Sequence, residues 1–149
     1  MFTREKLLDQ LNEVDSRHST LKKQFEIFHS KVKTQLNNSK FSLQGAKVTS
    51  LNNDDEFHIG FAGHKLRFKF SAVADPGSSV LYGYIYCHLV DLDEPKKVWL
   101  MEPLKFNVSG LSDLVFPEND NDNFNITDDS HATHIVLHCL YQSLSQTIT

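Results

Sequence analysis

The chain of 149 residues contains only two cysteines, Cys87 and Cys139, and no apolar run long enough to cross a membrane. Both cysteines lie among apolar neighbours, which indicates buried free thiols rather than a disulfide framework. The first residues also lack the apolar run that a secretory signal peptide requires. We therefore expect a cytoplasmic protein that has no disulfide bonds and does not associate with a membrane.

The sequence also lacks the short motifs that carry catalytic chemistry. It contains no glycine-rich phosphate loop, no glycine-flanked serine elbow and no sequence context that would activate a cysteine. The formal net charge of −4 argues against non-specific binding to nucleic acid or to anionic lipid. These absences predict no cofactor and no catalytic residue, and they direct attention to surfaces that could bind a partner.

The composition is that of an ordinary globular protein, with 40% hydrophobic and 23% charged residues. A chain of this length can bury a core without help from metal ions or disulfides, so we expect one domain over 1–149. Eleven phenylalanines give it a heavy aromatic content, and aromatic side chains dominate both cores and interfaces.

The first third of the sequence predicts a long helix over about 3–36. Thr3 is a suitable N-cap residue, and Glu5 follows in the first turn, where a carboxylate is favourable. Apolar residues recur at alternating spacings of four and three, which is the seam of a coiled coil. This seam consists of Leu7, Leu11, Val14, His18, Leu21, Phe25, Phe28 and Val32. Such a helix is long for one domain, so it either lies on the sheet, pairs with a second copy of itself, or bends near 15–20.

The segment over about 41–106 predicts an antiparallel meander of five strands. Apolar and polar residues alternate along it, and turn sequences at 52–55, 62–64 and 75–78 separate the strands. Centring the strands on these turns places Phe68 opposite Ile85 and beside Ile59, with all the phenylalanines on one face. The residues expected in the core are Phe57, Ile59, Phe61, Leu66, Phe68, Phe70, Ile85, Cys87 and Leu89.

The remainder of the chain predicts a connector and acidic loop over about 109–126 and a helix over about 128–145. Leu111, Leu114, Val115 and Phe116 are expected to pack within the connector, and Asp120 and Asp122 to lie in a polar surface loop. The last helix is apolar over more than half its circumference, so it is expected to be largely buried. The predicted fold class is α+β, with both helices packed together on the phenylalanine face of the five-stranded meander.

The opposite face of the predicted meander combines cationic and aromatic side chains. We call it the basic–aromatic face, and its candidate partner-binding residues are Arg67, Lys69, Tyr82, Tyr84, Tyr86 and His88. Lysine and arginine beside tyrosine on neighbouring strands stabilise one another by cation–π contact, so the face could simply be a solvated or covered sheet surface. Tyrosine and arginine are also the residues enriched at the centres of protein interfaces. Single-stranded nucleic acid could stack on the tyrosines, but the narrow basic cluster and the acidic chain argue against it.

Three histidines, His131, His134 and His138, form a stripe along the predicted last helix. Spacings of three and four place their imidazoles on one side, where they could chelate a transition metal, with Asp128 or Asp129 supplying an oxygen. The sequence lacks the glutamate that a zincin motif requires after its first histidine. The pattern therefore favours the ordinary polar stripe of a helix over a dedicated metal site.

We therefore expect a small, non-catalytic binding protein that acts through protein–protein contact, as an inhibitor, immunity-type or accessory protein, and that forms a homodimer. The alternative is a small-ligand-binding protein or an enzyme whose pocket lies between the sheet and the helices and is lined by phenylalanine, Trp99 and histidines. A metal-dependent activity at the histidine stripe is a third hypothesis.

Overall fold

A computed structural model describes residues 2–37, 43, 45–50, 55–75, 80–90, 98–116 and 119–145 of the chain. The elements in chain order are α1 (Arg4–Leu36), β1 (Lys47–Ser50), β2 (Glu56–Phe61), β3 (His64–Ala74), β4 (Leu81–Val90), β5 (Val98–Trp99), β6 (Leu104–Phe106), β7 (Leu111–Phe116), β8 (Asn119–Asn125) and α2 (Asp129–Ser145). The α+β class is confirmed. The number of strands is not, because the described sheet contains eight strands rather than five.

The helix α1 is continuous over 33 residues and begins where the sequence predicts. The Thr3 side chain accepts a hydrogen bond from the Lys6 backbone N–H at 3.2 Å, so it caps the first turn as expected. The alternative of a bend near 15–20 gains no support, because α1 is one continuous helix through this segment. The second half of the apolar seam is buried in the core: Leu21, Phe25, Phe28 and Val32 are each at most 1% exposed.

The sheet is antiparallel, in the order β1-β2-β3-β4-β6-β7-β8, and β5 also pairs with β4. The strands of the predicted meander are present, although residues 52–54 and 76–78 of the predicted turns, and all of 91–97 before the fifth strand, lie outside the described residues. The start of the first predicted strand, at 41–42, lies outside them as well. Strands that the sequence analysis missed are β6, β7 and β8, and they extend the sheet beyond β4.

The register of the central strands differs by two residues from the predicted one. Phe68 lies opposite Cys87 instead of Ile85, and Ile59 lies opposite Leu66 instead of Phe68. Between β2 and β3 the cause is turn geometry: the chain reverses in two residues at Ala62 and Gly63, with φ angles of 52° and 80°, as a type I′ hairpin turn requires. A shift of two residues preserves the direction of every side chain, so the prediction of which residues share a face is confirmed.

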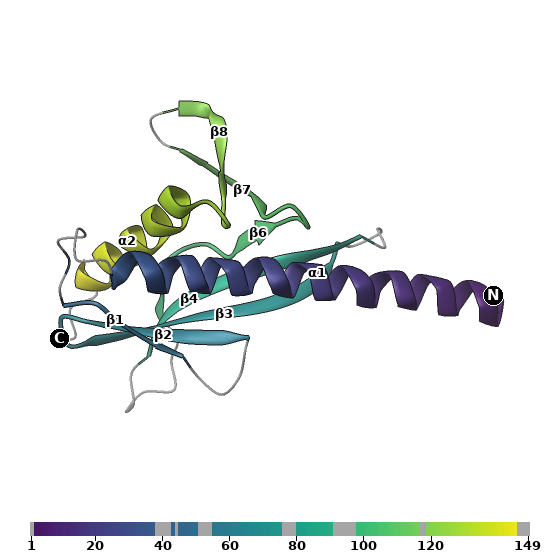
Figure 1. The fold of residues 1–149 in the computed structure, drawn as a ribbon, viewed down its shortest axis with the longest axis horizontal. Coiled ribbons are helices and arrows are strands. Elements are labelled where there is room, and N and C mark those ends of the chain that lie inside the picture. The colour runs from purple at the N-terminus through teal and green to yellow at the C-terminus, as the bar shows by residue number, and fades with distance from the viewer. Residues whose placement is uncertain are drawn as a thin grey trace.

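Both helices lie on the same side of the sheet, and α1 runs across β3 and β4 (Figure 1). The core between the layers contains all the predicted residues except Phe61, which is only partly buried. Phe57 and Phe68 stack at its centre, with ring centroids 5.0 Å apart. Helix α2 closes this core, and its Cys139 contacts Cys87 of the sheet. Burial, together with the neighbouring Cys139 thiol, raises the pKa of Cys87 well above its ordinary value.

The predicted connector and acidic loop form a β-hairpin instead, made of β7 and β8 (Figure 1). Leu111, Leu114 and Val115 are about 40% exposed, so they do not pack as a connector. Backbone pairing in a two-stranded ribbon satisfies the N–H and C=O groups, and the Asn123 side chain adds a hydrogen bond to the Ser112 carbonyl at 2.8 Å. These interactions override the low strand propensity of asparagine and aspartate. The buried Phe124 anchors the hairpin to the body of the molecule.

Helix α2 begins one residue after Asp128, whose Oδ1 accepts a hydrogen bond from the His131 backbone N–H at 3.1 Å. The carboxylate of Asp129 in its first turn pairs with the Lys31 ammonium of α1 at 2.7 Å. The buried side is apolar and includes Ile135, Val136 and Leu140. The two helices therefore pack together on the phenylalanine face, as the sequence predicts.

Candidate functional site

The basic–aromatic face is assembled on β3 and β4 by their cross-strand register. Arg67 lies opposite His88, and Lys69 lies opposite Tyr86. Tyr84 and Tyr82 continue the same face along β4, opposite residues 71 and 73 of β3. Because α1 and α2 both cover the other side, no described helix lies over this face (Figure 1).

The aromatic side chains of this face form a continuous row. The rings of Tyr84 and Tyr86 stack at 6.2 Å, and Trp99 of β5 lies 5.8 Å from Tyr86. Trp99 is 50% exposed, whereas His88, which meets it edge-on at 5.5 Å, is only 4% exposed. A partner approaching the face would therefore contact the tryptophan and the tyrosines, with His88 supporting them from below.

A network of charged side chains holds Arg67 in place. Its Nε donates a hydrogen bond to His58 Nε2 at 3.2 Å and lies 3.5 Å from the Glu56 carboxylate. Burial, followed by the positive charges of Lys65 and Arg67, lowers the pKa of His58 below its ordinary value of 6.5, while Glu56 opposes this shift. His58 is therefore a neutral acceptor for the arginine. Arg67 on β3 is thus held in place by two side chains of the neighbouring strand β2, His58 and Glu56.

The sequence analysis missed Lys105, which lies opposite Tyr84 on β6. Its ammonium is 2.8 Å from the Asp75 carboxylate and 4.2 Å from the centre of the Tyr82 ring, over which the Arg17 guanidinium also lies at 5.9 Å. The hydrogen bond to Asp75 raises the pKa of Lys105. Among the described residues, the cation–π contacts of this face thus involve Arg17 and Lys105 rather than the cations of β3 that the sequence suggested.

The signal that could have identified Lys105 is the alternation of a buried, a half-buried and a buried residue along Leu104, Lys105 and Phe106. A strand of three residues is too short for such a pattern to be distinctive. Trp99 is a candidate binding residue in the sequence analysis, which places it in the alternative pocket. The structure places it on the basic–aromatic face instead.

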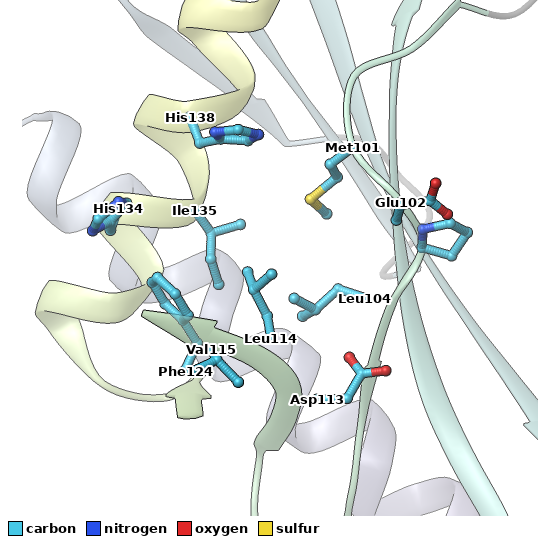
Figure 2. A pocket seen from close by; sticks show the side chains of 11 residues that line it. Met101, Glu102, Leu104, Asp113, Leu114, Val115, Phe124, His134, Ile135 and His138 are labelled. Carbon is cyan, nitrogen blue, oxygen red and sulfur yellow. The ribbon is translucent and has the colours of Figure 1, made fainter. Parts of the chain in front are cut away.

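A separate cavity of about 440 Å³ lies between α2, the β7–β8 hairpin and the segment 101–104 (Figure 2). Its apolar walls come from Met101, Leu104, Leu114 and other neighbours, and the labelled Glu102 and Asp113 carboxylates lie along one side. Phe124 and two histidines line it as the alternative hypothesis requires, but Trp99 does not. The side chains that line it are those of Met101, Glu102, Pro103, Leu104, Asp113, Leu114, Val115, Phe124, His134, Ile135 and His138.

The histidines of the predicted stripe make different contacts, although His134 and His138 both line the cavity. His131 Nδ1 accepts a hydrogen bond from the Asn125 backbone N–H at 2.8 Å, and the His134 ring meets Phe124 edge-on at 5.1 Å. His138 is exposed beside the cavity. Within the described part of the chain, no three histidine, cysteine or acidic side chains are grouped so that they could hold a metal ion. The metal hypothesis therefore gains no support from the geometry.

Among the described residues, neither helix is long and apolar enough to cross a membrane. No model of a protein family matches the chain, and no curated protein or solved structure matches it significantly.

Proposed function

We propose that the chain is a small, non-catalytic binding protein that acts through protein–protein contact and that it functions as a homodimer. Its partner-binding surface is the basic–aromatic face, with Tyr84, Tyr86 and Trp99 as anchors and Lys69 as an exposed cation. An inhibitor, an immunity-type protein or an accessory protein would act in this way.

The observation that carries this proposal is a row of three contacting aromatic rings, Tyr84, Tyr86 and Trp99, on a sheet face over which no described helix lies. Tyr84 and Tyr86 are partly exposed on the central strand β4, and Trp99 is half-exposed on β5 beside them. Large aromatic side chains lose little conformational freedom when a partner buries them. The surrounding cations favour a partner whose matching surface is acidic. The apolar centre with a charged rim is the usual arrangement of a specific protein interface.

The test is quantitative capture of proteins from the native organism by three forms of the chain: the wild type, a Tyr84→Ala/Lys69→Ala variant and a Tyr141→Ala/Lys23→Ala control. Tyr141 and Lys23 are exposed but lie on the helices, away from the face, so the control removes the same chemical groups. We expect the wild type and the control to capture a partner that the face variant loses. Higher salt should weaken the binding of this partner to the wild type. Equal capture by all three proteins, or capture of none, would overturn the proposal.

A second candidate function is binding of a small molecule in the cavity beside α2. The specific observation is its volume of about 440 Å³, which falls within the usual size of ligand sites, combined with mainly apolar walls. The carboxylates of Glu102 and Asp113 would favour a ligand that carries a positive charge at one end.

This second function is tested by following the Met101 methyl signal in NMR spectra during titration with small apolar amines. Leu114→Trp should fill the cavity and abolish the shifts, whereas Leu111→Trp should not. Both leucines lie on β7 with similar exposure, but only Leu114 lines the cavity. Shifts that are absent in the wild type, or that survive Leu114→Trp, would remove this candidate.

A further inference from the structure

The N-terminal part of α1 extends past the ends of β3 and β4 (Figure 1). Every residue from 2 to 13 is exposed. Contact with the rest of the molecule begins with Val14, which packs against the core, and with Arg17, whose Nε donates a hydrogen bond to the Leu81 carbonyl at 2.8 Å. We call residues 2–13 the overhang.

The overhang carries an apolar stripe that has no packing surface among the described residues. Leu11 is 64% exposed, and Leu7, Leu8 and Phe2 are between 43% and 57% exposed. Leu7 and Leu11 belong to the same seam that is buried against the sheet further along α1. The seam therefore continues beyond the edge of the surface that covers it, which indicates that something else covers its first two turns.

A second copy of the chain fits this stripe because it brings an identical seam with coiled-coil spacing. The charges select the orientation. If Leu7 of one copy faces Leu11 of the other in antiparallel alignment, Arg4 lies at Val14 of the second copy, next to the acidic Asp15 there. A parallel alignment would instead place the two Arg4 side chains against each other.

We infer that two copies associate through antiparallel pairing of their overhangs, so that the helix of one takes the place that the sheet occupies further along the other. This inference rests on the homodimer of the proposed function and specifies its interface. Taking about 200 Å² for a fully exposed large side chain, the four apolar residues offer roughly 430 Å² per copy. That is about half of what a standard interface buries on each side, so the dimer should dissociate on dilution.

The first test compares the mass of the protein by sedimentation equilibrium over a wide range of concentration for wild type, Leu11→Glu and Asn12→Glu. The two variants add the same charge at neighbouring exposed positions, but only Leu11 lies on the seam. We expect wild type and Asn12→Glu to dimerise and Leu11→Glu to remain monomeric with an unchanged melting temperature. A monomeric wild type, or a dimer that Leu11→Glu leaves intact, would overturn the inference.

The second test determines the orientation. Leu7→Cys and Leu11→Cys proteins are mixed and oxidised, which is possible because both native cysteines are buried. Antiparallel pairing predicts mainly the mixed disulfide between positions 7 and 11. Disulfides joining like positions would show parallel pairing and contradict the alignment. These variants leave the basic–aromatic face unchanged, so loss of dimerisation and loss of partner capture can be told apart.

Discussion

Replacing Gly83 with alanine should destabilise the protein, because the Phe106 ring lies directly on this glycine. The two residues are opposite each other on β4 and β6, and a methyl group at Gly83 would lie 2.6 and 2.7 Å from two of the ring atoms. Ordinary carbon contacts are about 3.5–4.0 Å, so the ring would have to move by about 1 Å. Phe106 is 1% exposed and is packed against Phe70, which leaves it little room to move. We expect Gly83→Ala to lower the free energy of unfolding by about 1–3 kcal/mol.

The assay is equilibrium urea unfolding followed by far-UV circular dichroism, with Gly60→Ala as the control. Gly60 lies in the same sheet with nothing within 4 Å of its missing Cβ, so alanine there should be neutral or stabilising by up to about 1 kcal/mol. In a Phe106→Leu background the cost of Gly83→Ala should fall, giving a measurable coupling energy. Equal effects at the two glycines, or a cost at Gly83 that does not depend on Phe106, would refute the steric explanation.

Three further predictions follow from burial and charge. Phe68→Ala should lower the free energy of unfolding by about 3–5 kcal/mol, whereas Tyr84→Ala on the opposite face should cost about 1 kcal/mol or less, as chemical denaturation would show. The folded-state pKa of His58 lies below 6.5, so the unfolded chain takes up a proton before the folded chain does as the pH falls. The contribution of His58 to the free energy of unfolding should therefore be fully present well above pH 6.5 and decrease as the pH falls below 6.5. His58→Gln should flatten this decrease in thermal melts at different pH values. Cys87 and Cys139 should resist alkylation in the native protein and react at the rate of global unfolding, since burial keeps both thiols inaccessible and raises the pKa of Cys87; rapid native-state labelling measured by mass spectrometry would contradict this.

The parts of the fold that the sequence predicted correctly are those with strong periodic patterns. The seam and the Thr3 cap located α1, and the alternation along β2, β3 and β4 separated the phenylalanine face from the tyrosine face. The exact register of β2 and β3 could not be derived because it depends on the φ angles at Ala62 and Gly63, and the sequence around Gly63 is also compatible with a longer turn.

The β7–β8 hairpin could not be predicted because its stability comes from backbone pairing and from contacts that are distant in sequence. Asn123 and its neighbours favour loops when they are considered alone. Backbone pairing with β7 and the anchoring of Phe124 against the body of the molecule together make the strand favourable. The same limitation concealed the cavity, whose walls come from three segments that no local pattern connects.

The six residues proposed from the sequence for the basic–aromatic face do share one side of the sheet, because side-chain direction alternates strictly along a strand. Their exposure could not be predicted from alternation alone. His88 is buried beneath Trp99, and Arg67 is held by Glu56 and His58, so neither is as available to a partner as the sequence suggested. Both facts depend on neighbours from other strands.

The ion pair between Lys31 and Asp129 joins α1 and α2, which lie near opposite ends of the chain, whereas β2, β3 and β4 are joined by short connections. Contacts between nearby residues form early in folding, because little loop-closure entropy opposes them. The hairpins of the central strands can therefore form before either helix has docked, and the phenylalanine face would then be exposed to water. Docking of the two terminal helices would then be the late event that covers this apolar surface. Deleting either helix should therefore cause the remaining chain to aggregate rather than to fold as a smaller native protein.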